Sequence, residues 1–280
     1  MKLIVDSGST KADWVAIYPD NTEKYFSTLG LNPEVLKQDE VLSRLNASVE
    51  IQVIKNTVTE LFFYGAGCGT ERMKNYLKTV LEAYFTQAKI VVLEDTYAAA
   101  YATTPKNEKA IVCILGTGSN CSYFDGTDLH QKIQSLGYLI MDDAGGVQFG
   151  RLLLREFYYN QMPPNIAQAF ATAFDTDADF IKQNLYKQPN PNAYLAQIAK
   201  FIFTHKEDVY IKNLISQEIT RFIKYQILQY PEANTVPINF IGSLAYYLKP
   251  EIEQLLNQHH LKIGTVYQKP IDGLIHYHKN

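Results

Sequence analysis

Short apolar runs divided by polar turns open the chain, and this pattern predicts β-strands before any helix. Three runs predict strands at Lys2–Val5, Ala12–Tyr18 and Glu23–Leu29, with a turn at Pro19–Asn21 between the last two. Two shorter runs predict strands at Leu61–Tyr64 and Lys89–Leu93. A helical stretch is predicted over residues 40–55, and apolar residues at helical spacing predict a helix over residues 71–85. The small, Ala-rich stretch over residues 96–103 predicts a helix packed closely against another element.

The same order of strands and turns returns roughly 110 residues later, after a polar break at Pro105–Lys109. Strands are predicted at Ala110–Leu115, Cys121–Phe124 and Leu129–Ser135, with a glycine-rich turn at Gly116–Asn120. Two unrelated meanders would also give such a pattern. The matching order of the turns favours a duplicated unit, so the polar break predicts a domain boundary.

The rest of the chain has mostly helical patterns, interrupted by two further strands. Helices are predicted over residues 147–159, 166–174, 177–186, 193–203, 209–229 and 244–258, with a short helix at the C-terminus. The strands are predicted at Ile238–Ile241 and Ile263–Tyr267. Three strands followed by alternating helices and strands, present twice, indicate an α/β fold with two similar halves.

Composition and charge exclude several classes of protein. The 280 residues are 46% hydrophobic and 20% charged, which is typical of a soluble globular protein of one large domain or two. A net charge of −3 gives no basis for binding nucleic acid or an anionic membrane. No apolar run approaches the roughly 20 residues that span a bilayer, and the N-terminus shows no signal-peptide pattern. We therefore expect a cytoplasmic protein.

The stretch Asp6-Ser-Gly-Ser-Thr-Lys11 is the first candidate for chemistry. Gly8 can take a positive φ and leaves no Cβ beside a ligand, and successive backbone N–H groups in such a turn suit an anion. Asp6 would place a carboxylate beside that anion, which is unfavourable without a cation, so the stretch suggests a Mg²⁺-nucleotide. A hairpin with a polar turn is the alternative interpretation.

Five motifs in this order resemble those of one superfamily. They are Asp6-Ser-Gly-Ser-Thr-Lys11, Gly30-Leu-Asn-Pro33, Glu94-Asp95-Thr96 before an Ala-rich helix, Leu115-Gly-Thr-Gly-Ser-Asn120 and Phe240-Ile-Gly-Ser243. The chain resembles the sugar-kinase/actin/chaperone superfamily of ribonuclease-H-like ATPases over nearly its whole length. Within that superfamily it is most similar to the N-acetylglucosamine kinase and BadF/BadG-type ATPase group.

The resemblance implies two ribonuclease-H-like domains, the actin-like ATPase fold, with a cleft between them and a second domain enriched in helices. We expect the domains at residues 1–107 and 108–270, with the C-terminal helix 271–280 joining the first. It also implies ATP and Mg²⁺ as cofactors, an amino sugar such as N-acetylglucosamine as substrate, and a homodimer. Neither nucleic acid nor membrane is an expected partner.

The resemblance also implies roles for individual residues. Those for ATP and its phosphates are Ser7, Gly8, Ser9, Thr10, Lys11, Gly116, Thr117, Gly118, Ser119, Gly242 and Ser243. Those for the sugar are Asn32, Asp95, Thr117, Gly118, Gly137 and Asp142. Asp6 would hold Mg²⁺ through water. Lys11 could add positive charge, although a lysine at the start of a strand is commonly just solvated.

Asp95 is the expected general base, because a sugar hydroxyl must lose its proton as it attacks phosphorus. An aspartate before Thr-x-x-Ala is also a good helix N-cap, so the local pattern alone allows both interpretations. Asn32, expected to bind sugar hydroxyls, could likewise be a turn asparagine in the left-handed region.

One segment departs from the family pattern. Where the family carries Gly-Asp-Glu-Gly-Ser, this chain has Met141-Asp-Asp-Ala-Gly-Gly146, so Asp143 replaces a glutamate and Met141 a glycine. This change, and a changed C-terminal helix, keep a non-catalytic sugar or nucleotide sensor open as an alternative function. An ATPase activator of a redox partner is another.

The cysteines and histidines offer no metal site by their spacing. An activator would need cysteines for an iron–sulfur cluster, but Cys113 and Cys121 are expected in the core, while Cys68 lies in a glycine-rich turn and could be exposed. The pairs His259-His260 and His276-x-His278 are expected to be solvated residues at helix ends.

Overall fold

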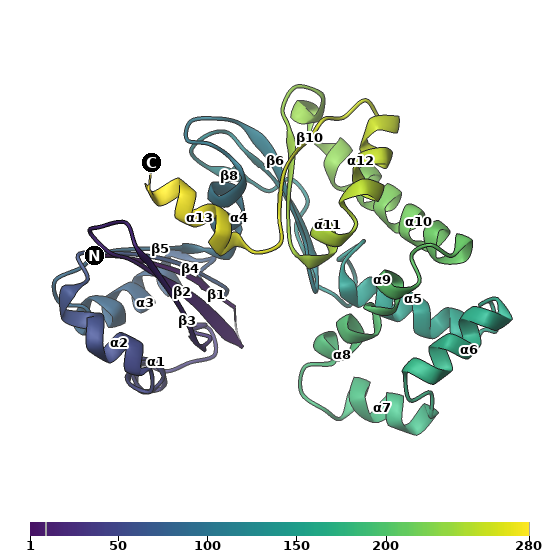
Figure 1. Ribbon diagram of the computed structural model, residues 1–280, viewed down its shortest axis with the longest axis horizontal. Coiled ribbons are helices and arrows are strands. Elements are labelled where there is room, and N and C mark those ends of the chain that lie inside the picture. Colours follow the sequence, from purple (N-terminus) through teal and green to yellow (C-terminus); the bar gives the residue numbers. More distant parts are fainter. Residues whose placement is uncertain (9, 280) are drawn as a thin grey trace. The chain divides into compact units, whose positions relative to one another are not determined.

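The apolar runs at the start of the chain pair into a mixed five-stranded sheet. In the computed structural model, which describes residues 1–8 and 10–279, the strand order is β3-β2-β1-β4-β5 (Figure 1). The strands are β1 (Lys2–Ser7), β2 (Lys11–Ile17), β3 (Glu23–Leu29), β4 (Glu60–Gly65) and β5 (Lys89–Glu94). Strands β1 to β3 form an antiparallel meander, and β4 and β5 run parallel to β1. The carboxyl ends of β1, β4 and β5 therefore lie at one edge of the sheet.

Helices cover both faces of this first sheet (Figure 1). The helices α1 (Gln38–Asn46), α2 (Val49–Ile54) and α3 (Glu71–Tyr84) share one apolar core with the sheet. On the other face, α4 (Asp95–Thr103) packs closely against α13 (Pro270–Lys279). A Cβ at Gly273 would lie 2.1 Å from the backbone oxygen of Ala102, so only glycine permits this approach. The close packing predicted for the Ala-rich helix is confirmed.

The chain divides into two compact units, each of which we describe by itself. The first comprises residues 1–106 and the segment from Lys269 onward, which carries α13. The second comprises residues 107–268. Its sheet has the order β10-β9-β6-β7-β8, built from β6 (Ala110–Leu115), β7 (Ser119–Phe124), β8 (Leu129–His130), β9 (Ile238–Ile241) and β10 (Ile263–Tyr267). Both sheets thus share one topology, which confirms the predicted duplicated α/β unit.

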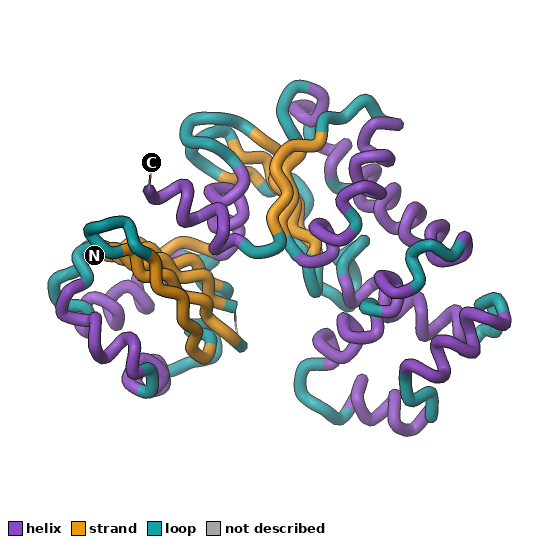
Figure 2. Tube along the Cα trace, viewed as in Figure 1, coloured by secondary structure: helices purple, strands orange, loops and turns teal. Residues whose placement is uncertain are grey.

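The second unit carries most of the helices (Figure 2). They are α5 (Gly146–Tyr158), α6 (Pro164–Ala173), α7 (Ala178–Tyr186), α8 (Pro191–Ile198), α9 (Phe201–Thr204), α10 (Val209–Tyr225), α11 (Ser243–Tyr247) and α12 (Lys249–Gln258). They bury a large apolar cluster together with β6 and β9. Within the described ranges, every helix is too short or too polar to cross a bilayer.

Several predicted elements are shorter than expected. The helix predicted over 193–203 is two helices, α8 and α9, and the one predicted over 209–229 ends at Tyr225. The strand predicted at Leu129–Ser135 ends at His130, because the Lys132 N–H donates to the Tyr230 hydroxyl at 2.9 Å and not to a neighbouring strand. The helix predicted over 40–55 is two helices, since Ser48 caps α2 by accepting from the Ile51 N–H. The helix predicted over 244–258 restarts at α12, where Pro250 lies in the first turn and has no N–H to continue α11.

The expectation that His278 is solvated is wrong. Its ring lies 4.0 Å from that of Phe62, and its Nε2 is 2.8 Å from the Tyr64 hydroxyl. Lys2 donates to its backbone oxygen at 2.6 Å. Burial, and then the positive charges of Lys2 and Lys106, lower the pKa of His278 to about 4. The α13 helix is therefore held on the first sheet by a neutral imidazole.

We expect the stability of the first unit to fall in mild acid for this reason. The pKa of His278 is depressed from 6.5 in the fold, so its contribution is complete above pH 6.5 and is lost as the pH falls towards 4. The loss is about 3 kcal/mol in the free energy of unfolding. Denaturant unfolding at pH 7.5 and 4.5 measures it, and His278→Gln should remove this part of the pH dependence. The control His276→Gln should keep it, since His276 is exposed.

Candidate active site

Two aspartates lie at the carboxyl edge of the first sheet. Asp6 is near the end of β1, and Asp95 directly follows β5. Ser7, Gly65 and Glu94 are aligned in register across β1, β4 and β5, so Asp6 lies one residue before this row and Asp95 one residue after it. Burial, then the negative charges of Asp95 and Asp13, raise the pKa of Asp6 to about 7, while Lys269 lowers it. The carboxyl edge of the first sheet therefore brings acidic side chains close together where solvent is largely excluded.

Asp95 begins helix α4 but is not its N-cap. The N-cap position is Glu94, which makes no side-chain cap hydrogen bond. Burial, then the negative charge of Glu94, raise the pKa of Asp95, and the backbone N–H groups of Thr96 and Asp95 offset part of this rise. A half-buried carboxylate with a raised pKa at a strand end is suited to accept a proton from a bound hydroxyl group.

The first glycine turn, between β1 and β2, is anchored by its backbone. The Gly8 N–H donates to the Lys11 oxygen at 2.9 Å, and the Gly30 N–H donates to the Thr10 oxygen at 3.0 Å. Gly8 lies outside the left-handed region, contrary to expectation, and a Cβ there would be 3.6 Å from the Lys11 oxygen. The fold therefore tolerates a side chain at Gly8. Ser9, a predicted phosphate residue, lies outside the described residues.

Two other predicted phosphate residues of this turn are engaged by the protein. Ser7 is fully buried, and its hydroxyl accepts from the Leu31 N–H at 2.9 Å. The ammonium of Lys11 lies 2.6 Å from the carboxylate of Asp13, which also accepts from Ser27. Burial acts to raise the pKa of Asp13, but these hydrogen bonds and the Lys11 charge hold it below its usual value. Ser7 thus ties the turn to the 30–33 loop.

Asn32 is placed by a glycine that sequence analysis did not assign. Asn32 is buried, and its side-chain oxygen accepts from the Glu34 N–H at 2.9 Å. A Cβ at Gly67 would lie 2.0 Å from that same oxygen, and Gly67 has a φ of +81°. The absence of a side chain at Gly67, in the turn after β4, therefore leaves room for the Asn32 side chain. The signal was present as Gly65-Ala-Gly-Cys-Gly69, but only the fold shows what it faces.

The second glycine turn, between β6 and β7, is covered by the segment that departs from the family pattern. The N–H groups of Gly146 and Val147 donate to the oxygens of Gly116 and Thr117, both at 2.9 Å. A Cβ at Gly118 would lie 2.5 Å from the carboxylate of Asp142. The structure thus brings together Thr117, Gly118 and Asp142, three of the predicted sugar residues. Burial raises the pKa of Asp142, and the Ser119 N–H partly offsets this.

Gly137, another predicted sugar residue, forms a turn before this segment. It has a φ of +77°, and its oxygen accepts from the N–H groups of Ile140 and Met141. No neighbouring atom lies within 4 Å of a Cβ built on it. The structure therefore gives Gly137 a backbone role in this turn.

Two side chains of helix α10 contact the altered segment, Met141–Gly146. Asp142 and Ala144 have φ of +68° and +58°, so the backbone is strained there. The Arg221 Nε donates to the Asp143 carboxylate at 2.7 Å, and the buried Glu218 carboxylate lies 3.5 Å from the Ala144 N–H. Asp143, which replaces the family's glutamate, therefore anchors the segment to the protein.

Arg221→Ala tests this anchor. We expect the segment to relax and the sugar affinity to fall roughly fivefold, the equivalent of about 1 kcal/mol, with nucleotide affinity nearly unchanged. Isothermal titration with sugar and with ADP measures both. Lys224→Ala, an exposed position on the same helix, is the matched control. Unchanged sugar affinity in Arg221→Ala would show that the ion pair does not position Asp142.

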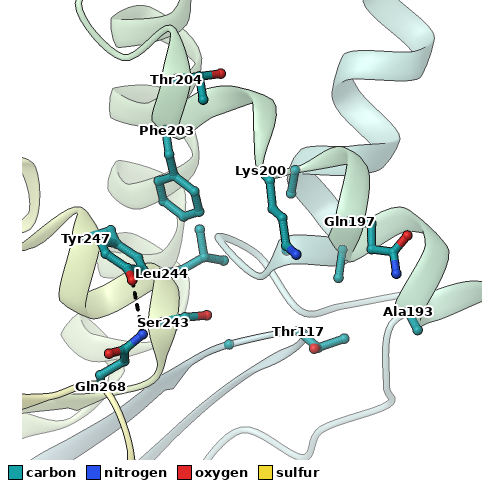
Figure 3. Close-up of a pocket in the computed structure, with 14 residues that line it drawn as sticks. Thr117, Ala193, Gln197, Lys200, Phe203, Thr204, Ser243, Leu244, Tyr247 and Gln268 are labelled. Carbon is teal, nitrogen blue, oxygen red and sulfur yellow. Dashed lines mark hydrogen bonds between the residues drawn. The ribbon is translucent and has the colours of Figure 1, made fainter. Parts of the chain in front are cut away.

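A pocket of about 680 Å³ opens beside the second turn (Figure 3). Gly116 and Thr117 line it on one side. Phe203 and Tyr247, with ring centroids 5.2 Å apart, and Ser243 line it on another. Gly242, with a φ of +117°, allows the chain to pass from β9 into α11, because a Cβ there would lie 2.3 Å from the Leu115 oxygen.

Sequence analysis missed the far wall of this pocket. That wall comes from α8, α9 and their junction, which contribute Ala193, Ala196, Gln197, Ala199, Lys200, Phe203 and Thr204. Helical periodicity identified the region as helix but contained no signal for a binding surface. Gln268, which donates to the Tyr247 hydroxyl at 3.2 Å, was also missed.

The acidic edge of the first unit fits a Mg²⁺ ion that arrives with a nucleotide. Within residues 1–8 and 10–279, no group of three or more His, Cys, Asp and Glu is arranged to hold a metal by itself. Mg²⁺ commonly takes one or two protein carboxylates and completes its shell with phosphate oxygens and water. Asp6, desolvated and beside other carboxylates, is the residue whose environment a cation would relieve.

Solved structures similar to this chain include two proposed N-acetylglucosamine kinases. The one from Porphyromonas gingivalis is 32% identical, with a TM-score of 0.92 over 99% of this chain and 98% of the other. The one from Chromobacterium violaceum is 14% identical, with a TM-score of 0.70 over 99% and 98%. A ROK family glucokinase from Streptomyces griseus, in complex with glucose and AMPPNP, shares the fold at 15% identity, with a TM-score of 0.57 over 99% and 97%. No protein-family model and no curated protein matches the chain.

Proposed function

The chain belongs to the N-acetylglucosamine kinase and BadF/BadG-type ATPase family of the sugar-kinase/actin/chaperone superfamily, and we propose that it phosphorylates an amino sugar with ATP. The observation that carries this proposal is the position of Asp95, a half-buried carboxylate with a raised pKa at the end of β5. It shares the carboxyl edge of one sheet with Asp6. The substrate is proposed as N-acetylglucosamine or a close relative.

In the first unit, the geometry supports three proposed roles. Asp95 would take the proton from the attacking sugar hydroxyl, for which its raised pKa is favourable. Asn32, held in place by Gly67, would donate to and accept from other hydroxyls. Asp6 would hold Mg²⁺ through water. When bound, that ion would offset the charge of the phosphates during transfer.

In the second unit, the pocket beside Gly116 is the proposed nucleotide site. The turn formed by Gly116, Thr117, Gly118 and Ser119 would bind phosphate, with the N–H groups of Thr117 and Gly118 as the proposed donors, since that of Gly116 donates to the Gly118 oxygen and that of Ser119 to the Asp142 carboxylate. Ser243 would lie along the nucleoside. Asp142, packed on Gly118, is proposed to bind the sugar together with Thr117 and Gly118. The predicted homodimer and cytoplasmic location stay predictions.

The two alternative functions differ in their support. The altered segment that suggested a sensor is bound by Arg221 and Glu218, and it keeps Asp142 against the turn, which favours an intact site. The activator would need cysteines that can reach a cluster. Cys68, Cys113 and Cys121 are all buried, so the possibility that Cys68 is exposed is wrong, and the core positions predicted for the other two are confirmed.

A coupled ATP-consumption assay over a panel of hexoses, amino sugars and their anhydro and muramic relatives tests the proposed function. We expect one amino sugar to be a strong acceptor, with product identified by mass spectrometry as a sugar phosphate. If no sugar in the panel is phosphorylated, the kinase proposal is rejected. Thermal stabilisation by a sugar without ATP consumption would support the sensor, and sugar-independent hydrolysis would support the activator.

A further inference from the structure

Lys200 is the one charged side chain among the described residues that line the pocket of the second unit. It lies between α8 and α9, and its side chain points into the cavity (Figure 3). The other lining residues are glycine, alanine, leucine, threonine, serine, glutamine and two aromatic residues. None of these carries a charge that could balance an ammonium group.

Lys200 also takes part in none of the ion pairs found within residues 1–8 and 10–279. The next two lysines along the chain do form ion pairs. Lys206 lies 3.8 Å from the carboxylate of Glu251, and Lys212 lies 2.9 Å from that of Glu207. An ammonium group that faces a pocket without a carboxylate favours an anionic occupant.

The rest of the pocket indicates which anion would fit. At one side, the Gly116–Thr117 turn offers the Thr117 N–H and hydroxyl as donors suited to phosphate, while the Gly116 N–H donates to the Gly118 oxygen. At another, Phe203 and Tyr247 offer aromatic faces suited to a planar base, with Leu244 between them and the turn (Figure 3). A molecule with a base at one end and phosphates at the other matches both surfaces.

We infer that Lys200 binds the phosphates of ADP and ATP, while its methylene stem packs along the nucleoside. The inference rests on the proposed function and adds the residue that supplies cationic charge within the second unit. Because the contact is electrostatic, it makes the pocket favour nucleoside diphosphates and triphosphates over the nucleoside itself. It also predicts that this preference weakens as salt is added.

Isothermal titration of the full chain with adenosine, AMP and ADP tests the inference, with wild type, Lys200→Met and Lys200→Arg compared at two salt concentrations. Met keeps the stem and removes the charge. We expect the ADP affinity of Lys200→Met to fall at least about tenfold, with adenosine affinity within about twofold of wild type. Lys200→Arg should retain most of the ADP affinity, and the salt dependence should shrink in Lys200→Met. Lys187→Met, exposed and outside the pocket, is the matched control.

The outcomes separate this inference from the kinase proposal. Unchanged ADP affinity in Lys200→Met, with wild type binding ADP, would overturn the inference and leave the kinase standing. An equal loss for adenosine and ADP would assign Lys200 to packing and overturn the phosphate contact. A wild-type protein that binds none of the three ligands would overturn both. A loss confined to AMP and ADP, rescued by arginine, is the expected result.

Discussion

Asp95→Asn is expected to lose at least about 100-fold in sugar-kinase turnover, the effect usual for removing a general base. Asparagine keeps the size of aspartate but does not accept a proton at neutral pH. The sugar should still bind, because asparagine retains one oxygen for hydrogen bonding. Steady-state rates with the accepted sugar measure the loss, and isothermal titration measures the sugar affinity.

Protein stability distinguishes loss of the base from loss of the fold. Burial and the charge of Glu94 raise the pKa of Asp95, so the folded state disfavours its ionised form. A neutral side chain there should leave the melting temperature unchanged or higher. Asp39→Asn, at an exposed position in α1, is the control for turnover. A fully active Asp95→Asn would remove Asp95 from the mechanism.

Gly242→Ala is expected to lower the free energy of unfolding of the second unit by about 3 kcal/mol or more. Gly242 has φ of +117° and ψ of 160°, a region that residues with a Cβ hardly populate. The added Cβ would also lie 2.3 Å from the Leu115 oxygen and 3.1 Å from the Gly116 nitrogen. Both contacts are with backbone, so no side chain can move aside.

The same substitution should abolish nucleotide binding, because relief of the clash moves Gly116 or Ser243, which line the pocket. Denaturant unfolding and titration with ADP measure the two effects. Gly116→Ala is the matched comparison for stability, since no atom lies within 4 Å of a Cβ built there. A Gly242→Ala protein as stable as Gly116→Ala would contradict the steric argument.

Much of the fold could be predicted because its signals are local. The nearly continuous apolar run in Ala12–Tyr18 suits a strand buried on both faces, and the chain forms β2 there, with Trp14 to Ile17 all buried. Glycine turns follow β1 and β6 at matching places, so the duplicated topology was visible in the order of elements. Asp6 and Asp95 could be selected for the same reason, since each stands at the end of an apolar run.

Contacts between distant residues decided what the local pattern left open. The predicted strand after Leu129 stops because of Tyr230, which is 98 residues away from Lys132. His278 is neutral because it packs on Phe62 and Tyr64, although its neighbours in sequence suggest a solvated helix end. Burial and long-range packing are set by the whole fold, and a window of sequence does not contain them.

The sequence by itself determined the α/β architecture, the two glycine turns and the candidate base, because these depend on short-range periodicity and turn chemistry. Only the tertiary structure decided that Gly67 makes room for Asn32, that Arg221 anchors Asp143 across 78 positions, and that Lys200 faces a pocket whose other described lining residues are uncharged. Each of these features depends on residues that are far apart in the sequence and come together only in the folded chain. Their spacing along the sequence therefore does not predict them.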